Sequence, residues 1–430
     1  MSRKRIYLES YGCPSNKFDS QVMVTKLEEV GHIITGNYED ADIVVVNTCG
    51  VKSPTEAKIL HRLNFLKNLD KPIVVTGCLS KIDLPAIKKA VPNYLALVDP
   101  FSIERIAVAI EGVESTRERG QHIFAEETIV KAELSSVHKG GVIEIVPIAE
   151  GCLGACSFCC TRFARGRLFS YPMKTVVDRV KRLVCSGTRE IWLTAQDTGA
   201  YGLDVGCNLA DLLDEVCGIW GNFLVRVGMM NPNNLLGMLD SLIEAYKCEK
   251  IFKFLHIPVQ SGNDEVLKLM NRFYTVHDFK RIVDSFRRKV PNLSLATDVI
   301  CGFPGEDEEA FEDTLRLIRE IEPDIVNISK FSPRPNTTAS HMKQLPSNIV
   351  KDRSTKVAAL CKSISLKRNK NWLEWRGGVL IDEKGKKDSV MGRNTAYKPI
   401  VIKGKCELLG KWAEVQVKEV TTTYLVGEPV

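Results

Sequence analysis

The sequence predicts an α/β protein with three parts: an amino-terminal doubly wound α/β domain, a central partial barrel of six β/α units, and a small carboxy-terminal β-barrel. Two patterns predict this fold class. Apolar strand-like runs alternate with amphipathic helical stretches up to about residue 345, and the chain from Trp372 onward is rich in strands and glycine turns. The length of 430 residues is enough for two or three domains with large cores.

The amino-terminal domain is predicted at 1–125. Its strands are expected at 5–10, 42–47, 72–76 and 94–98. Amphipathic helical stretches lie between them, for example Ser20 to Val30 and Leu84 to Ala90. Residues 126–140 have weak periodicity and lead into Gly141, so they are predicted to form a linker.

The central domain is predicted at 141–345. Its six strands are expected at 143–148, 190–195, 223–228, 251–257, 294–300 and 325–331. Six units without a seventh or eighth predict an incomplete barrel with a lateral opening, and the chemistry of such barrels lies at the carboxyl ends of the strands. A helix at 346–370 then connects to a β-barrel at 371–430, with turns at Gly377, Gly392 and Gly404.

Composition and charge narrow the setting of the protein. The net charge is +6, and residues 361–430 alone hold 14 Lys and Arg against 8 Asp and Glu. This excess fits binding to a phosphate backbone, and it equally fits a solvated charged surface. The 14 cysteines predict a reducing, cytoplasmic setting, and no apolar run reaches the length of about 20 residues that a membrane helix needs, so no membrane partner is expected.

The most informative motif is a C-x3-C-x2-C array formed by Cys152, Cys156 and Cys159. Three thiolates on one loop can hold an iron–sulfur cluster and leave one iron of a cubane without a protein ligand. An open iron of this kind can bind a substrate or cofactor. The alternatives are a zinc site, which would need a fourth ligand that no paired cysteines after this loop supply, and a chance grouping in a reduced protein.

Three more cysteines each follow an apolar strand-like run, and a glycine lies beside each of them: Cys13, Cys49 and Cys78. In a parallel sheet the loops at the carboxyl ends of the strands converge, so these three residues can meet and hold a second cluster. The neighbouring glycines would allow close approach to a bulky ligand. Each cysteine alone could equally be a small buried apolar residue.

Polar residues at the ends of the central strands are candidates for cofactor and substrate contacts, because they share this position: Gln196, Asp197, Arg226, Gln260, Ser261, Asp298 and Arg334. Any of them could instead be a satisfied polar residue at the barrel rim. Arg162, Arg165 and Arg167 follow the cysteine loop. They are expected either to guide an RNA phosphate or to pair with acids in the fold.

The array from Cys152 to Cys159, with Phe158 before the last cysteine, resembles the signature of the radical S-adenosylmethionine enzymes. The resemblance implies a 4Fe-4S cluster whose open iron binds S-adenosylmethionine, and reductive cleavage of that cofactor to a radical that abstracts hydrogen. Two cysteine triads on successive domains resemble the methylthiotransferases of that superfamily. This implies a second, auxiliary 4Fe-4S cluster that supplies sulfur. Cys160, an extra cysteine next to Cys159, departs from the family pattern and is expected not to be a ligand, since adjacent cysteines rarely reach the same cluster.

Within that branch, the segments 152–159, 161–167 and 226–232 resemble the archaeal and eukaryotic type. The resemblance implies 2-methylthiolation of N6-threonylcarbamoyladenosine at position 37 of tRNA. It also implies that Arg226 and Gln260 hold the methionine part of the cofactor. A ribosomal protein aspartate, isopentenyladenosine, or an iron–sulfur scaffold without radical chemistry remain as alternatives, and the sulfur and electron donors stay unknown.

The carboxy-terminal barrel resembles the TRAM module, an RNA-binding fold. The resemblance implies tRNA as the partner. Exposed basic residues there would neutralise phosphates, with Lys398 among them, and three aromatic side chains, Trp375, Tyr397 and Trp412, could stack on bases or pack in the core. The predicted RNA contacts are Arg162, Arg165, Arg167, Arg334, Lys403, Lys405 and Lys411.

Overall fold

The structure is a computed structural model that describes residues 3–116, 120–125, 128–136 and 141–430, with the backbone alone for 112–116. It divides into two compact units. The first unit comprises Met1–Lys139, Pro147–Thr175 and Ser332–Ser340, and the second comprises Gly140–Val146, Val176–Phe331 and His341–Val430. The loop with Cys152 to Cys159 therefore groups with the amino-terminal segment.

The first unit contains a parallel six-stranded sheet of order β2-β1-β3-β4-β5-β6. Four of these strands lie where the apolar runs predict them: β1 (Arg5–Ser10), β3 (Ile43–Thr48), β4 (Ile73–Gly77) and β5 (Ala96–Val98). Two strands were not predicted, β2 (Ile33–Thr35) and β6 (Gln121–Ile123). Each has only three residues, too few to show a period of two, and neither belongs to a longer apolar run as the three residues of β5 do.

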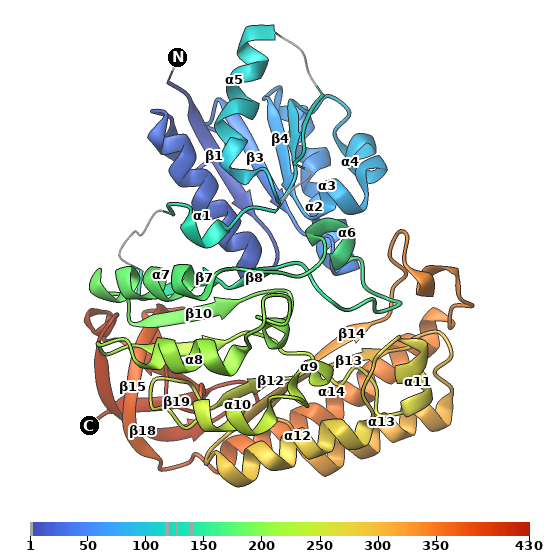
Figure 1. The fold of residues 1–430 in the computed structure, drawn as a ribbon, viewed down its shortest axis with the longest axis vertical. Coiled ribbons are helices and arrows are strands. Elements are labelled where there is room, and N and C mark those ends of the chain that lie inside the picture. Colours follow the sequence, from blue (N-terminus) through green and yellow to red (C-terminus); the bar gives the residue numbers. More distant parts are fainter. Residues whose placement is uncertain (1–2, 117–119, 126–127, 137–140) are drawn as a thin grey trace. The chain divides into compact units, whose positions relative to one another are not determined.

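Helices cover this sheet, as expected for a doubly wound domain, and Figure 1 shows them in blue and cyan. The helices α2 (Ser53–Leu66), α3 (Leu79–Ile82) and α4 (Leu84–Ala90) pack on β3 and β4 in one apolar core. The helices α1 (Pro14–Glu29) and α5 (Ile106–Thr116) contact each other. The first of these begins six residues before the predicted Ser20, since Pro14 is suited to the first helical position after Cys13.

The predicted linker at 126–140 lies partly outside the described residues, namely at 126–127 and 137–140. Its described part contains the short helix η3 (Lys131–Glu133), in which Lys131 and Ala132 are buried. The segment around Lys131 and Ala132 therefore packs into the first unit and is not a solvated connection, although its sequence has weak periodicity.

The second unit contains the six predicted strands of the partial barrel, in two parallel sheets of order β11-β10-β7 and β12-β13-β14. A parallel bridge between Val225 and Ile251 connects the two sheets. The bounds of the strands are β7 (Ile143–Pro147), β10 (Glu190–Thr194), β11 (Leu224–Val227), β12 (Phe254–His256), β13 (Ser294–Cys301) and β14 (Ile325–Lys330).

Amphipathic helices alternate with these strands and bury one apolar face each. They are α7 (Met173–Cys185), α8 (Leu209–Cys217), α9 (Pro232–Leu235), α10 (Leu239–Ala245), α11 (Asp264–Leu269), α12 (Val276–Lys289) and α13 (Glu308–Ile321). The predicted helix from Leu235 to Tyr246 is interrupted, because α9 ends at Leu235 and α10 begins only at Leu239. The partial (β/α)6 barrel is thus confirmed.

The predicted connecting helix is α14 (Ser347–Lys370). After it, five strands close into a barrel of order β15-β16-β17-β19-β18 around an apolar core. They are β15 (Arg376–Lys384), β16 (Ser389–Arg393), β17 (Pro399–Lys403), β18 (Trp412–Val420) and β19 (Leu425–Pro429). Of the helices in the described ranges, none combines the length and apolar character that crossing a membrane would require.

Candidate active site

The three amino-terminal cysteines lie at the carboxyl ends of three adjacent strands. Cys13 follows β1 and is the N-cap of α1, Cys49 follows β3, and Cys78 follows β4. A Cβ atom added to Gly12, where φ is +105°, would lie 2.7 Å from the Cβ of Cys49. Glycine at this position therefore allows the loop that carries Cys13 to lie against Cys49.

Asn16, in the first turn of α1, connects all three cysteine loops and is fully buried. Its Nδ2 donates to the carbonyl oxygens of Tyr11 and Thr48, both at 2.8 Å, and these residues lie just before Cys13 and Cys49. Its Oδ1 accepts from the Cys78 thiol at 3.7 Å. Asn16 was not among the residues predicted from the sequence, where its place three residues after Cys13 is the only local sign of this role.

The second cysteine array also lies in the first unit, between the paired strands β8 (Ala149–Glu150) and β9 (Phe169–Ser170). Cys152, Cys156 and Cys159 are all partly exposed. A Cβ atom on Gly154 would lie 3.4 Å from the Cys152 sulfur and 3.6 Å from the Cys156 sulfur. The glycine thus keeps free a space that both sulfur atoms border.

The two cysteine sites are neighbours within the first unit. Cys160 and Ala164, from the segment after the array, pack with Cys78 and Ile82 in one buried apolar cluster. The Cys160 thiol donates to the carbonyl oxygen of Gly50 at 3.3 Å, next to Cys49. The sulfur of Cys160 therefore already has a partner, which supports the prediction that it is not a cluster ligand.

Burial changes the acidity of several thiols. It raises the pKa of Cys49, and it raises that of Cys78 to about 11 although the nearby Arg165 cation acts in the opposite direction. Burial, followed by the charge of Cys159, raises the pKa of Cys160 to about 11. Metal ligands must be thiolates, so loading of the amino-terminal site has to release protons.

The donor set fits a cluster better than a single ion. Within the part of the chain that the structure describes, no three His, Cys, Asp or Glu side chains converge on one point as a bound ion requires. In a cubane each thiolate binds a different iron, so the sulfur atoms lie around the group instead of at one centre. Cys49 beside Gly12, and Cys152 and Cys156 beside Gly154, border spaces of this kind, which favours a cluster over a single zinc ion.

Two of the arginines predicted to contact RNA are buried within the first unit. Arg165 in α6 (Thr161–Arg165) and Arg334 are only 1% and 6% exposed. Arg165 pairs with Asp19 and Glu150, and Arg334 donates to the carbonyl oxygen of Gly50 at 2.7 Å and pairs with Glu56. Both guanidinium groups are thus held by partners within the first unit, which argues against their contact with RNA, and RNA contact by these two residues stays an untested prediction.

The remaining arginines of this patch stay candidates for RNA contact. Arg162 is partly exposed and Arg167 is exposed. Pairing with acids in the fold, which was the alternative from the sequence, holds for Arg165.

In the second unit, two of the predicted cofactor contacts have structural partners. Asp197 is 3% exposed and accepts from the backbone N–H groups of Gly199 at 3.1 Å and Asn231 at 2.9 Å, and from Asn234 Nδ2 at 2.7 Å. Ser261 is fully buried and its Oγ accepts from Asn263 N–H at 3.3 Å. These contacts organise the loops after β10 and β12.

The other cofactor candidates lie nearby in the chain or on the same strands. Gln196 is partly exposed, and Gln260 has a positive φ of 67°. The backbone of Gln260 pairs with β13, donating to Asp298 O at 2.8 Å and accepting from Ile300 N–H at 3.0 Å. This pairing fixes the loop that carries the Gln260 side chain.

Asp298 belongs to a polar group that spans three adjacent strands. Its carboxylate lies 3.2 Å from His256 Nε2 on β12 and accepts from Asn327 Nδ2 on β14 at 2.7 Å. Because alternate residues of a strand share a face, His256 and Asp298 project from the same face as Phe254 and Ala296. His256 and Asn327 were not selected from the sequence, which does not show that the two side chains meet Asp298 across the sheet.

Arg226 on β11 lies among aromatic rings. Its guanidinium carbon is 5.2 Å from the ring centre of Trp192, 5.4 Å from that of Phe254 and 5.5 Å from that of Tyr397. Its Nε is buried, and no described residue accepts a hydrogen bond from it. A buried donor without an acceptor is costly, so this atom remains suited to bind a ligand.

On the closed barrel, Lys403, Lys405 and Lys411 are exposed. All three lie at the end of β17 or in the connection that leads to β18. Lys398, which was expected to neutralise phosphate, is instead 5% exposed and donates to Asp324 at 2.8 Å. The three aromatic residues pack in apolar clusters, Trp375 in one and Tyr397 and Trp412 in another, so the alternative of base stacking is not supported.

Three family models match the chain. They are Uncharacterized protein family UPF0004 at residues 5–98, the Radical SAM superfamily at 146–318 and the TRAM domain at 378–430. Among solved structures, the radical S-adenosylmethionine methyltransferase TsrM from Kitasatospora setae has 14% identity and a TM-score of 0.59 over 79% of this chain and 77% of that chain. At this identity the likeness concerns the fold alone.

Curated proteins are similar over the full length of the chain. A protein of Pyrococcus abyssi named "Probable threonylcarbamoyladenosine tRNA methylthiotransferase" is 45% identical, with 99% of each chain covered. The human protein named "Threonylcarbamoyladenosine tRNA methylthiotransferase" is 34% identical over 99% of this chain and 74% of that one. The chain therefore belongs to the family of radical SAM enzymes named threonylcarbamoyladenosine tRNA methylthiotransferases.

Proposed function

We propose that this protein converts N6-threonylcarbamoyladenosine at position 37 of tRNA to its 2-methylthio derivative. The names of its full-length relatives and the TRAM match support this substrate. The observation that carries the proposal is that two cysteine triads lie side by side in the first unit, where Cys160 and Cys78 pack together. A sulfur site and a radical site have to be close for one enzyme to use both on one base.

The roles of the residues follow from their positions. Cys152, Cys156 and Cys159 would hold the 4Fe-4S cluster that binds S-adenosylmethionine, and Cys13, Cys49 and Cys78 would hold the second 4Fe-4S cluster. When bound, these groups supply the radical and the sulfur. The chain supplies position: Gly154 keeps the first site open, and Asn16 ties the three loops of the second site together.

The cofactor and RNA contacts complete the proposal. Arg226, with a buried donor that no described residue accepts from, and Gln260 would hold the methionine part of S-adenosylmethionine. Gln196, which follows β10, and Asp298, which lies within β13, would make further contacts to the cofactor. Lys403, Lys405, Lys411 and the exposed Arg167 would contact tRNA phosphates. A tRNA substrate and fourteen free cysteines also support a cytoplasmic location.

The test is an anaerobic reaction of the reconstituted protein with S-adenosylmethionine, a strong reductant, sulfide and tRNA that carries threonylcarbamoyladenosine. Digested RNA is then analysed by mass spectrometry. The expected result is the 2-methylthio nucleoside together with 5′-deoxyadenosine. Cofactor cleavage without that nucleoside contradicts the proposed substrate and favours another acceptor, and absence of both contradicts the proposed chemistry.

A further inference from the structure

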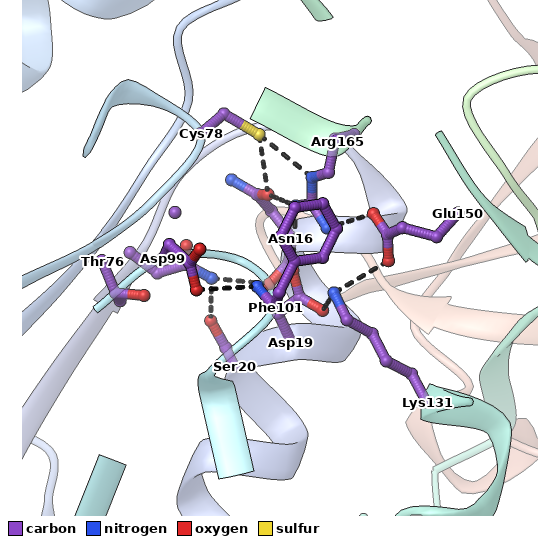
Figure 2. Close-up of polar contacts among 12 residues, drawn as sticks. Asn16, Asp19, Ser20, Thr76, Cys78, Asp99, Phe101, Lys131, Glu150 and Arg165 are labelled. Carbon is purple, nitrogen blue, oxygen red and sulfur yellow. Dashed lines mark hydrogen bonds and ion pairs between the residues drawn. The ribbon is translucent and has the colours of Figure 1, made fainter. Parts of the chain in front are cut away.

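Four buried charged side chains form a closed ring of ion pairs in the first unit, as Figure 2 shows. Arg165 pairs with Asp19 and Glu150, each at 2.8 Å. Lys131 pairs with the same two carboxylates, at 2.9 Å and 2.8 Å. All four side chains are at most 3% exposed.

A ring of this kind is a poor means of stabilisation alone. Removing four charges from water costs about as much as their attraction returns, and well-packed apolar residues often replace buried ion pairs without loss. The ring instead holds its four side chains, and the chain segments that carry them, in fixed positions. Its role is therefore indicated by which segments it connects.

The ring joins both ends of one cysteine array to the other cysteine site. Glu150 lies two residues before Cys152, and Arg165 ends the short helix that begins at Thr161, two residues after Cys159. Asp19 lies in α1, which begins after Cys13. The loop of one triad is thus attached to the helix of the other.

One nitrogen of Arg165 lies outside the ring and points at a cysteine. Its Nη1 faces Glu150, its Nη2 faces Asp19 and Asn16, and its Nε donates to the Cys78 sulfur at 3.2 Å. The guanidinium group is planar and rigid, so two carboxylates that hold its ends also fix the direction of the Nε–H bond. A lysine ammonium cannot be oriented in this way.

We propose that Arg165 is a positioning residue that holds a fixed hydrogen bond to the Cys78 thiolate and thereby raises the reduction potential of the cluster at Cys13, Cys49 and Cys78. The inference rests on the proposed function, which assigns a cluster to these three cysteines. Hydrogen bonds to cluster sulfurs and local charge set such potentials, and a donor favours the more negative, reduced state. The two carboxylates of Asp19 and Glu150 cancel the charges of Lys131 and Arg165. The effect on the potential is therefore expected from the directed hydrogen bond and not from net charge.

The test uses the full-length chain with Cys152, Cys156 and Cys159 all changed to Ala, so that the amino-terminal site alone can hold a cluster. The potential of that cluster is measured by a redox titration followed by electron paramagnetic resonance. Arg165→Lys keeps the positive charge and loses the directed donor. We expect the equilibrium constant for reduction of the cluster to fall about tenfold, which corresponds to a reduction potential about 59 mV lower for one electron.

Two control variants distinguish the effect of the hydrogen bond on the potential from the effects of the ion-pair ring and of a change in α6. Glu150→Gln removes a negative charge but keeps an amide oxygen that can accept from Arg165 Nη1, so the guanidinium keeps its direction toward Cys78 and the potential should stay or rise. Arg162→Lys changes a partly exposed residue of the same helix and should leave the potential unchanged. Iron content and the unfolding temperature are measured for every variant.

The outcomes differ for this inference and for the function on which it rests. A parent chain without iron contradicts the proposed second cluster, and the inference fails with it. If the parent chain holds a cluster and Arg165→Lys has the same potential as the parent, the role of Arg165 is contradicted while the second cluster stands. The same conclusion follows if Glu150→Gln lowers the potential as much as Arg165→Lys does. Loss of iron from Arg165→Lys at an unchanged unfolding temperature also contradicts it, because Arg165 would then be needed to hold the cluster and not to set its potential.

Discussion

At the residue scale, Cys159 and Cys160 are adjacent in sequence and have different surroundings. Cys159 is partly exposed, whereas Cys160 is 1% exposed and its thiol donates to the Gly50 carbonyl oxygen. Spacing alone marks Cys159 as the third member of the array. Burial and the bond to Gly50 support the prediction that its neighbour Cys160 is not a fourth ligand.

This difference predicts opposite results for two alanine variants. Cys159→Ala should lower the iron content of the reconstituted protein by about half and abolish release of 5′-deoxyadenosine, because one of two cubanes loses a ligand. Cys160→Ala should retain both the iron and the cleavage. Iron analysis and chromatography of the nucleoside measure the two effects, and cleavage by Cys159→Ala would contradict the assignment of the array.

Asp197 was predicted from its place after a strand to contact the cofactor, and its contacts predict an effect on stability. Asp197→Ala leaves two backbone N–H groups and the Asn234 amide without their acceptor, which should lower the free energy of unfolding by about 3 kcal/mol. Denaturant unfolding measures the change. Asp197→Asn retains an acceptor and serves as the control; equal stability of all three proteins would show that the loop does not depend on these bonds.

At the element scale, β10 and β15 meet through a pair of buried acids. Burial, followed by the charge of Asp382, raises the pKa of Glu190 to about 8, while Asp382 pairs with Arg393 at 2.7 Å. A carboxyl group whose pKa is raised by folding binds more protons in the folded state between about pH 4.5 and about pH 8. Stability from this group is therefore present at low pH and is lost as the pH rises through that window.

The second unit should accordingly become less stable between about pH 5 and about pH 8. Glu190→Gln, which is neutral at every pH, should remove this part of the slope. Glu383→Gln changes a more exposed acid that also pairs with Arg393 and should keep the slope. Unfolding midpoints across the pH range measure the effect, and an identical slope in the wild type and Glu190→Gln would refute the assignment.

The connection between β17 and β18 predicts the salt dependence of tRNA binding. Changing Lys403, Lys405 and Lys411 together to Ala should weaken tRNA binding and lower the slope of log affinity against log salt by about 2 to 3. Lys247→Ala is a suitable control, since Lys247 pairs with Glu244 on α10. Filter binding at several salt concentrations measures the slope, and an unchanged slope would place the RNA contacts elsewhere.

At the scale of the whole molecule, local patterns predict the fold better than the site. The strands of both α/β parts were found because runs such as 43–48 and 294–301 are apolar and long enough, whereas β2 and β6 are three-residue strands outside any longer apolar run. The cysteine triads were found from spacing and from their place after strands. These features depend on a few neighbouring residues.

The partners of Arg165 could not be predicted in this way. Asp19, Lys131 and Glu150 come from three different elements, and no local pattern connects them. For the same reason the sequence could not show that Arg334 is buried against Glu56, or that Lys398 pairs with Asp324. Buried ion pairs require the tertiary fold, and the sequence alone leaves such cations as candidates for an external phosphate.

The central claim is that one chain holds a radical site and a separate sulfur site, and the most direct measurement is a reaction with Cys13, Cys49 and Cys78 all changed to Ala. Loaded anaerobically and given S-adenosylmethionine, reductant and the modified tRNA, this variant should still release 5′-deoxyadenosine but yield no 2-methylthio nucleoside. Formation of the methylthio product would contradict the claim, because sulfur would then reach the base without the amino-terminal cysteines.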